Sequence, residues 1–557
     1  MKKTGKNARG CGRVRAEIDG RIVEFDKGTP WKALVRQPGA LGVSVGGSTL
    51  SLNAPARDGA QVHALTYADE EGRRIYERTL ELMFLAAAQK VIPGRRVRFE
   101  HSFGDGVFVR LPKTTVTRAL AGRIEREMRE MAERDIPIAY TQCTKEEANA
   151  YFAATGQTDK LRLFQYRKLD TFHFYELEGV KEYFYGEMAP STGCVKVFQI
   201  RLYLPGLLLR WPGEETEGLR MAPFADMPKL MRTFGDTGRM NGVLGCENAA
   251  DVNEMIERRT FRDFIRVSEA IHERNIGQIA EQTVRSGARV VLIAGPSSSG
   301  KTTFAHRLII ALRALGLKPM KLSLDDYYRD RAELPLEADG RPDLERLDTL
   351  DVPLLDEHLV RLLQGEAVEA PEFDFVRGVR AERTHTIKVA ADQPIVIEGI
   401  HGLNDELTES VPRELKFKIY VSALTMLNLD DHNRIHTTDA RLLRRIVRDY
   451  QFRGTEPEGT IAMWPSVRRG EEKYIFPYQE QADAMFNSAL PYELPILKKF
   501  VYPMLCRIEP QSPCYTMARR LVKFLNYIRT SDAEDEVPIN SILREFTGGC
   551  CFYREED

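Results

Sequence analysis

Residues 289–303 read RVVLIAGPSSSGKTT, and this stretch decides the fold of the second half of the chain. An apolar, β-branched run leads into Gly295-Pro-Ser-Ser-Ser-Gly300-Lys301-Thr302, and a helical pattern, FAHRLIIALRALG, follows. A strand, a glycine-bearing loop and the start of a helix, in that order, form the P-loop pattern. The backbone N–H groups of such a loop and the positive end of the helix dipole surround a phosphate chain. The stretch therefore predicts nucleotide binding.

The roles within the loop follow from what each group can donate. Lys301 is predicted to reach the β- and γ-phosphates of ATP, and the Thr302 hydroxyl to ligate Mg²⁺. ATP and Mg²⁺ are accordingly the expected cofactors. The residues predicted to bind the nucleotide are Gly295, Ser297, Ser298, Ser299, Gly300, Lys301, Thr302 and Thr303.

Two later strands end in acidic residues. The segment LSLDDYYRD, residues 322–330, places Asp325 and Asp326 at the carboxyl end of a strand, which faces the ligand crevice of an α/β sheet. A hydroxyl that accepts a phosphoryl group needs a carboxylate to receive its proton, and a solvated acidic turn is the alternative interpretation. The segment QPIVIEGIHGL, residues 393–403, ends its strand in Glu398, a predicted ligand of Mg²⁺ together with Thr302.

An arginine-rich stretch, RIHTTDARLLRRIVRDYQFRG, occupies residues 434–454. Its pattern predicts a helix, and an exposed amphipathic helix is one interpretation of its charge. In an enzyme that transfers phosphoryl groups, the helix can instead be a lid whose guanidinium groups neutralise charge on the γ-phosphate. The arginines concerned are Arg441, Arg444, Arg445, Arg448 and Arg453.

Strands and helices alternate from residue 289 to about 505, which predicts βαβ units and a doubly wound parallel sheet. Residues 289–505 resemble the uridine kinase/phosphoribulokinase family. GPSSSGKTT is similar to the P-loop of that family, LSLDDYY to its S-x-D-[SD]-[FY]-Y motif, and VIEGI to its F-E-G-I motif. FDFVRGVR, residues 373–380, is similar to its nucleoside-binding segment, and RRIVRDYQFRG to its lid.

The resemblance implies a role for each matched residue. Asp325 would be the base at the 5′-hydroxyl of a nucleoside, with Lys301 and Arg448 as the other catalytic residues. The nucleoside would be bound by Phe373, Phe375, Arg445 and Arg453. Two positions depart from the family: a histidine of the nucleoside-binding segment is Gly378 here, and an arginine past the lid is Thr455. Loss of hydrogen-bonding groups alters specificity strongly, so the base that is recognised stays open.

The first half of the chain resembles two other modules. Residues 12–70 are similar to a TGS domain, a ubiquitin-like β-grasp, and residues 71–250 to the α+β editing domain of threonyl- and alanyl-tRNA synthetases. The resemblance rests on segments such as RRIYERTLELMFLAAA and APSTGCVKVFQI. The expected organisation is therefore a multidomain α/β and α+β chain, divided into a basic tail (1–11), these two modules, a helical linker (251–288), the P-loop domain (289–510) and a helical tail (511–557).

The metal ligands of the editing domain are missing. Glu77 and Glu81 take the places of one histidine pair, and Phe184 and Met188 those of a cysteine and a histidine. Phenylalanine cannot ligate a metal and a thioether is a poor zinc ligand, so editing chemistry is not expected. His101 has no partner at metal spacing and is predicted to be structural. For residues 1–250, weak RNA or tRNA contact, control of the kinase and homo-oligomerisation stay open.

The composition of the chain limits the partners and the cellular locations that can be expected for the protein. The 557 residues include 80 Lys and Arg against 81 Asp and Glu, which gives no overall attraction to nucleic acid or membranes. The eight cysteines form no C-x-x-C pair, and no apolar run reaches the length of a transmembrane helix. These features predict a cytoplasmic protein. Besides a nucleoside kinase, the sequence leaves open a kinase of another small hydroxyl compound, such as a sugar phosphate, and an RNA-binding regulator with a nucleotide switch.

Overall fold

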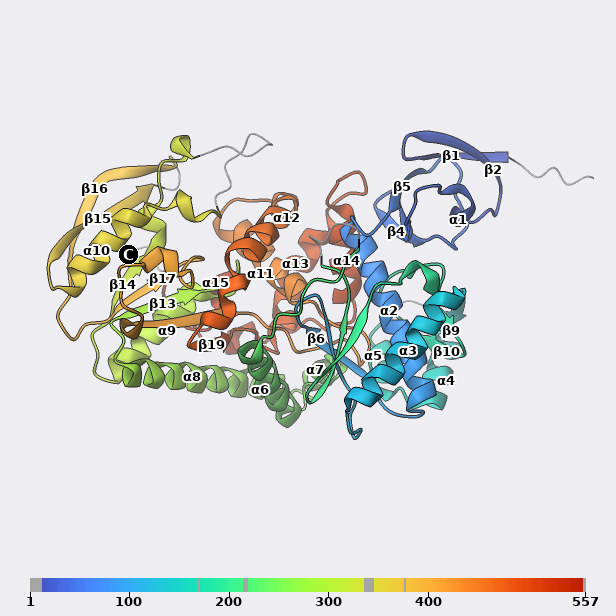
Figure 1. The fold of residues 1–557 in the computed structure, drawn as a ribbon, viewed down its shortest axis with the longest axis horizontal. Coiled ribbons are helices and arrows are strands. Elements are labelled where there is room, and N and C mark those ends of the chain that lie inside the picture. Colours follow the sequence, from blue (N-terminus) through green and yellow to red (C-terminus); the bar gives the residue numbers. More distant parts are fainter. Residues whose placement is uncertain (1–12, 168–170, 214–218, 335–344, 375–376, 554–557) are drawn as a thin grey trace, which may run out of the picture.

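The computed structural model describes residues 13–167, 171–213, 219–334, 345–374 and 377–553. The chain forms an elongated molecule with the P-loop region at one end and the amino-terminal sheet at the other (Figure 1). Within the described ranges, no helix combines the length and the apolar character that are needed to cross a membrane. The predicted basic tail, residues 1–11, lies outside the described residues.

A small five-stranded sheet begins the described chain. Its strand order is β2-β1-β5-β3-β4, and β1 runs parallel to β5 while the other neighbours are antiparallel. Trp31, which begins α1, is fully buried in the core of this unit. The TGS-like assignment stays a prediction. The elements are β1 (Arg13–Ile18), β2 (Arg21–Asp26), α1 (Trp31–Leu34), β3 (Gly42–Val45), β4 (Ser48–Ser51) and β5 (Gln61–Leu65).

The middle of the chain is built around α2 (Glu70–Val91), whose residues from Thr79 to Ala88 are all buried. Two antiparallel sheets surround it, with strand orders β11-β12-β7-β6 and β10-β9-β8. The editing-like assignment stays a prediction. The strands are β6 (Arg98–Ser102), β7 (Gly106–Arg110), β8 (Ala139–Thr144), β9 (Thr171–Leu177), β10 (Val180–Glu182), β11 (Gln199–Tyr203) and β12 (Gly206–Arg210), and the further helices are α3 (Arg118–Arg134), α4 (Lys145–Thr155) and α5 (Thr158–Phe164).

The segment GLRMAPFADMPKLMRTFGDTGRMNGVLGCENAADVN, residues 218–253, is rich in glycine and weak in periodicity, which predicts loop and linker. The structure has a 17-residue helix there, α6 (Pro228–Leu244). Leu230 and Phe234, four residues apart, lie on one face and pack against Leu424. Lys229 donates to the backbone oxygens of Glu480 and Ala482, at 2.9 and 2.6 Å. These tertiary contacts outweigh the low helix propensity of glycine, so the prediction of a loop is wrong.

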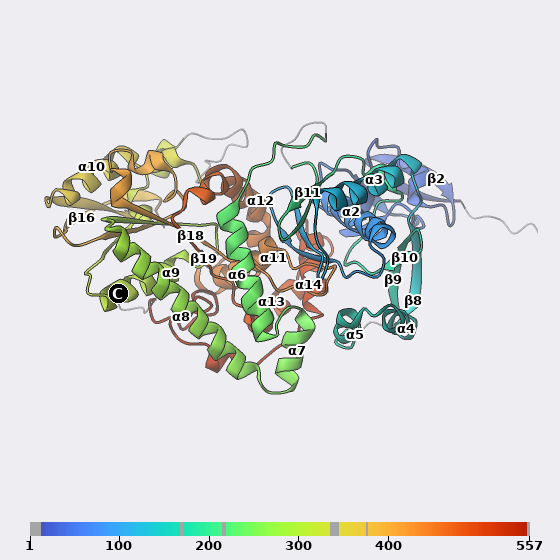
Figure 2. The same cartoon turned by 60° about the horizontal axis from the view of Figure 1, so that its bottom comes forward.

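The helical linker is two helices rather than one long helix. Helix α7 (Ala249–Glu257) ends where Arg259 has a φ of +60°, and α8 (Phe261–Ser286) then begins. A residue in the left-handed region ends the run of helical hydrogen bonds, which separates the two helices. Helix α8 runs along one side of the molecule toward the P-loop region, with α9 beside it (Figure 2).

The P-loop region contains a five-stranded sheet of order β14-β17-β13-β18-β19, in which every neighbouring pair is parallel. The predicted parallel sheet is confirmed. All residues of β13 and β18 are buried. The sequence of β13, VVLIA, is accordingly an apolar run, whereas that of β18, KFKIYVS, also contains two buried lysines. The strands are β13 (Val290–Ala294), β14 (Met320–Ser323), β17 (Ile395–Glu398), β18 (Lys416–Ser422) and β19 (Ala484–Asn487).

Helices and one hairpin complete this region. The hairpin, β15 (Ala367–Asp374) with β16 (Val379–Lys388), lies outside the parallel sheet. The helices are α9 (Lys301–Ala314), α10 (Val352–Leu363), α11 (Thr437–Phe452), α12 (Pro457–Tyr474), α13 (Glu493–Cys506), α14 (Tyr515–Leu525) and α15 (Arg544–Thr547).

One hydrophobic core is shared by the two halves of the chain. It contains Phe152 and Phe164 from the middle region together with Leu442, Tyr492 and Tyr527 from the second half. The phenol of Tyr183 lies 2.7 Å from that of Tyr527, so polar contacts cross the junction as well. The boundary near residue 250 is therefore not a boundary between separate cores.

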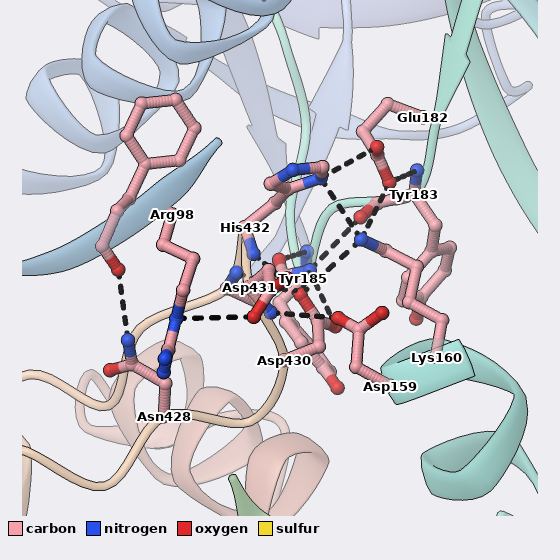
Figure 3. Close-up of polar contacts among 12 residues, drawn as sticks. Arg98, Asp159, Lys160, Glu182, Tyr183, Tyr185, Asn428, Asp430, Asp431 and His432 are labelled. Carbon is pink, nitrogen blue, oxygen red and sulfur yellow. Dashed lines mark hydrogen bonds and ion pairs between the residues drawn. The ribbon is translucent and has the colours of Figure 1, made fainter. Parts of the chain in front are cut away.

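A buried polar network, shown in Figure 3, connects the halves within this junction. Lys160 has no exposed surface and lies 2.9 Å from Glu182 and 3.4 Å from Asp430, which is also fully buried. Nδ1 of His432 lies 2.7 Å from the Glu182 carboxylate. Burial raises the pKa of Glu182, but Lys160 and His432 outweigh this and hold it at about 2. The network fixes residues 430–432, which precede α11, against the middle region.

Candidate active site

The phosphate loop connects β13 to α9 at the carboxyl edge of the parallel sheet. Ser298 and Gly300 have φ values of +56° and +80°, so the loop turns back sharply before α9 begins. Gly295 approaches β18 so closely that an added Cβ would lie 1.8 Å from the carbonyl oxygen of Val421. Only glycine fits there, and the start of the predicted motif is thereby explained.

Thr302 and Glu398 are brought together by the adjacent strands β13 and β17. The Thr302 hydroxyl donates to Oε1 of Glu398 at 3.0 Å. Oε2 of Glu398 is buried and has no hydrogen-bond partner among the described residues. A buried carboxylate oxygen without a partner, next to a hydroxyl, is a donor set that suits Mg²⁺. The two residues therefore fit the predicted metal ion, and burial raises the pKa of Glu398 while Lys301 opposes this.

Asp325 and Asp326 lie just beyond β14, in a 3₁₀ turn that spans Leu324–Tyr327. The surrounding protein raises the pKa of Asp325 by desolvation, and the positive charges of Lys301 and Arg453 oppose this only in part. Desolvation and the neighbouring Asp325 raise the pKa of Asp326 as well. In the register of β14 and β17, Ser323 lies opposite Glu398, so the turn with Asp325 leaves the sheet at the same edge as the Thr302–Glu398 pair.

Three of the predicted arginines, Arg445, Arg448 and Arg453, interact with the same carboxylate. Asp449 accepts from Arg445 at 3.1 Å and from Arg448 at 2.8 Å, and it lies 3.7 Å from Arg453. Arg445 also donates to the Ser297 hydroxyl at 2.7 Å, which connects this group to the phosphate loop. The structure therefore brings the three predicted arginines together beside the loop, through an aspartate that the motif did not identify.

Two other arginines of the stretch are buried rather than exposed. Nε of Arg441 donates to the carbonyl oxygen of Ser297 at 2.9 Å, and Arg444 lies within 3.4 Å of that of Ser298. Both guanidinium groups are also paired with buried glutamates, Arg441 with Glu471 and Arg444 with Glu493. The interpretation of α11 as an exposed amphipathic helix is therefore wrong, because two of its arginines are buried and interact with the backbone of the phosphate loop.

Two carboxylates outside the predicted motifs accept hydrogen bonds from the two ends of the phosphate loop. The backbone N–H of Ser297 donates to Glu471 at 2.9 Å. The N–H and the hydroxyl of Thr303 donate to Glu545 of α15, at 3.2 and 2.7 Å. Ile542 packs so closely against Gly300 that an added Cβ would lie 2.4 Å from its Cγ2. The carboxyl-terminal tail is therefore part of this site, although no motif marks it.

The predicted acceptor pocket lies at the hairpin. Phe373 is buried, and its ring centroid lies 5.7 Å from that of Tyr328, whereas Phe375 lies outside the described residues. Gly378 has a φ of +70°, and an added Cβ would lie 2.6 Å from Cδ of Arg331. Arg331 therefore takes the space beside the position where the family has a histidine. Thr455 donates through its N–H to the carbonyl oxygen of Asp449 at 3.0 Å.

Comparison with known proteins matches this region to relatives. The phosphoribulokinase/uridine kinase family matches residues 290–493. Uridine kinase of Deinococcus deserti is 32% identical over 197 residues, which is 35% of this chain and 86% of the relative. Uridine kinase of Halobacterium salinarum is 32% identical over 192 residues, or 34% of this chain and 76% of the relative. The chain belongs to the phosphoribulokinase/uridine kinase family.

Membership of the phosphoribulokinase/uridine kinase family makes the protein a phosphotransferase that acts on a hydroxyl group. Among solved structures, D-glycerate 3-kinase from Cryptococcus neoformans is 15% identical, covering 48% of this chain and 90% of its own, with a TM-score of 0.22. The part that matches the family contains Lys301, Asp325, Glu398 and Asp449 but ends before Glu545. The contact of the tail with the loop therefore lies outside the matched region.

The positions predicted to replace the metal ligands of an editing domain lie far along the chain from this site. Glu77 and Glu81 pair with Arg434, the latter at 3.8 Å, while Phe184 and Met188 are buried in the apolar core of the middle region. The ring of His101 is stacked between aromatic rings, with centroid distances of 5.2 Å to Phe108 and 3.8 Å to Phe234. Across the described ranges, no group of three or more His, Cys, Asp or Glu side chains is arranged to hold a metal ion.

Proposed function

We propose that the protein transfers the γ-phosphate of ATP to the 5′-hydroxyl of a nucleoside in the presence of Mg²⁺. The observation that carries the proposal is that one edge of the sheet holds the Thr302–Glu398 pair, the turn with Asp325 and the start of α9 with Lys301. These groups supply a phosphate cradle, a proton acceptor and a metal-binding pair. Phosphoryl transfer needs little else from a protein, because positioning and charge stabilisation supply most of the catalysis.

Each of these residues would have its own role in the reaction. The N–H groups of the loop and Lys301 would bind and orient the phosphates of ATP. Thr302 and Glu398 would hold Mg²⁺, which neutralises charge on the phosphate oxygens when it is bound. Asp325 would accept the proton of the acceptor hydroxyl as the new bond forms. Arg445, held between Ser297 and Asp449, would stabilise charge on the transferred group.

The acceptor pocket supports a nucleoside whose base is recognised differently from that of the uridine kinases. Phe373 presents an aromatic ring that suits a base or a ribose face. Gly378 supplies no side chain, and Arg331 takes the adjoining space. A guanidinium group donates up to five hydrogen bonds and accepts none, so it favours a base with carbonyl or ring-nitrogen acceptors on the edge that faces it.

The test of the catalytic role is Asp325→Asn, with Asp326→Asn as the matched control. We expect the first variant to lose turnover by about a hundredfold or more, the range for removal of a general base, and to bind ATP as the wild type does. Asp326→Asn should retain most of the activity. Wild-type turnover in Asp325→Asn would show that this carboxylate is not the base.

The acceptor itself is identified by ADP release from Mg·ATP, measured with each compound of a panel. The panel contains ribonucleosides and deoxyribonucleosides, with ribulose 5-phosphate and tRNA as the alternatives. Stimulation by one nucleoside supports the proposal. Stimulation by ribulose 5-phosphate alone would make the protein a sugar phosphate kinase, and stimulation by tRNA alone would favour a nucleotide-switched RNA-binding protein.

A further inference from the structure

A cavity of about 80 Å³ lies where the middle region meets the segment that precedes α11. We refer to it as the junction cavity. Helix α2 forms one wall through residues 74, 77, 78 and 81, whose spacing of three and four places them on one helical face. Helix α14 forms a second wall through Arg520 and Lys523, and residues 429–439 close the cavity. None of the residues predicted for phosphoryl transfer lines it.

Cationic side chains outnumber acidic ones on the walls of the junction cavity. The acidic side chains are already engaged, since Asp439 pairs with Arg74 at 3.5 Å and with Arg520 at 2.5 Å, and Glu77 pairs with Arg434. The wall contains the cations Arg74, Arg78, Arg434, Arg520 and Lys523 and the acidic residues Glu77, Glu81 and Asp439.

Two of these cations have no carboxylate partner. Nε of Arg78 donates to the backbone oxygen of Glu187 at 3.0 Å, and its terminal nitrogens pair with no acid in the described part of the chain. Lys523 has neither a hydrogen bond nor an ion pair with any described residue. Gly186 lies directly against Arg78, since an added Cβ would be 2.5 Å from its Cζ. The backbone is thus shaped to admit this guanidinium.

The charges on the walls are unbalanced at neutral pH. Burial lowers the pKa of Lys523 to about 8, although Glu187 opposes this, and Arg167 and Arg78 lower it further. Burial raises the pKa of Glu81 to about 8, and the neighbouring Glu77 adds to the effect. Burial thus favours the uncharged form of Glu81, which leaves the cations on the walls less compensated. An anion between Arg78 and Lys523 would relieve the repulsion of these cations.

We propose that the junction cavity binds a phosphate group, either inorganic phosphate or the phosphate of a small ester, through Arg78 and Lys523. Guanidinium and ammonium groups together are the usual donors to phosphate oxygens, and charge-assisted hydrogen bonds of this kind are strong. The volume corresponds to about five to eight water-sized spheres, which accommodates one tetrahedral oxyanion. The assignment does not rest on the proposed kinase reaction.

The position of this site connects it to α11. Asp439, on its wall, lies in the first turn of α11, and Arg441 and Arg445 of the same helix hold Ser297 of the phosphate loop. On the other side, His432 and Tyr185 belong to both the cavity wall and the buried network of Figure 3. The wall of the cavity is therefore connected through α11 to the phosphate loop and through residues 432 and 185 to the buried network.

The experiment measures binding of inorganic phosphate to the full chain by titration calorimetry and by the shift in Tm. Because the P-loop also binds phosphate, Lys301→Met is measured beside Lys523→Met, and Lys318→Met is the control for removal of an exposed lysine. We expect phosphate to bind wild type, Lys301→Met and Lys318→Met at this site. Lys523→Met should bind it about tenfold more weakly or worse, and Lys523→Arg should bind it nearly as wild type does.

The outcomes separate the site from the P-loop. Loss of all phosphate binding in Lys301→Met, with full binding in Lys523→Met, would overturn the proposal, as would the absence of binding to wild type at millimolar phosphate. Without phosphate, Lys523→Met should be at least as stable as wild type, because a half-buried cation that forms no ion pair with a described residue is removed. Should that variant fail to fold, Arg78→Gln gives the same test. Tighter binding of glycerol phosphate than of phosphate would identify an ester as the ligand.

Discussion

At the scale of single residues, the raised pKa of Asp325 has a direct consequence for activity. The base must be ionised to accept a proton, so kcat/KM for the acceptor should fall on the acid side as Asp325 is protonated. We expect this limb at a pH above the ordinary value of 3.8, because desolvation outweighs the attraction of Lys301. A pH–rate profile checks this. A plateau that extends below pH 4 would contradict it, and Asp326→Asn should retain the limb.

A second prediction at this scale concerns recognition of the acceptor. Arg331 lies against Gly378, where the family has a histidine, and on the proposed function its guanidinium would contact the base of the nucleoside. Arg331→Ala should raise KM for the preferred nucleoside about tenfold and leave KM for ATP unchanged, because a donor to the base is lost. The matched control is Arg383→Ala, because Arg383 is exposed and lies on the β15–β16 hairpin, whose turn contains Gly378. Equal effects of the two substitutions would exclude a specific role for Arg331.

At the scale of elements, α15 affects the phosphate loop through one carboxylate. Glu545 accepts from the N–H and hydroxyl of Thr303, groups at the helix N-terminus that phosphates of a nucleotide would also bind. Two anions compete for these donors, so Glu545→Gln should bind ATP about tenfold more tightly than wild type. Titration calorimetry measures this, with Glu509→Gln as the control. Weaker binding by Glu545→Gln would show that the carboxylate supports the loop instead.

The elements around the phosphate loop show which parts of the structure could be predicted from the sequence. Strand β13, the loop and α9 follow from local pattern, as does the parallel sheet, because buried strands and glycine positions are encoded within a few residues. Helix α6 was missed because its stability comes from Leu230, Phe234 and Lys229, which contact residues about 190–250 positions later. Glu471 and Glu545 were missed for the same reason, since no short motif contains an acid that meets the loop only in the folded chain.

At the scale of the whole molecule, the shared core predicts that the two halves unfold together. Lys160 is fully buried between Glu182 and Asp430, and removal of its charge takes a buried cationic partner from both carboxylates, which leaves Glu182 with His432 alone. Lys160→Met should lower the free energy of unfolding by about 3–5 kcal/mol, whereas the control Lys113→Met should change it little. Calorimetry should show one transition in both. A separate transition for the P-loop region in Lys160→Met would contradict a single cooperative unit.

The contact between the tail and the phosphate loop also has a consequence for the order in which the protein matures. Residues 295–303 leave the ribosome more than 200 residues before Glu545 and Tyr553, which both contact Thr303. A nascent chain therefore carries its nucleotide loop without these contacts until the segment with Glu545 and Tyr553 has also been synthesised. A truncation before residue 545, or an insertion next to it, would therefore disturb a nucleotide loop that was synthesised more than 200 residues earlier.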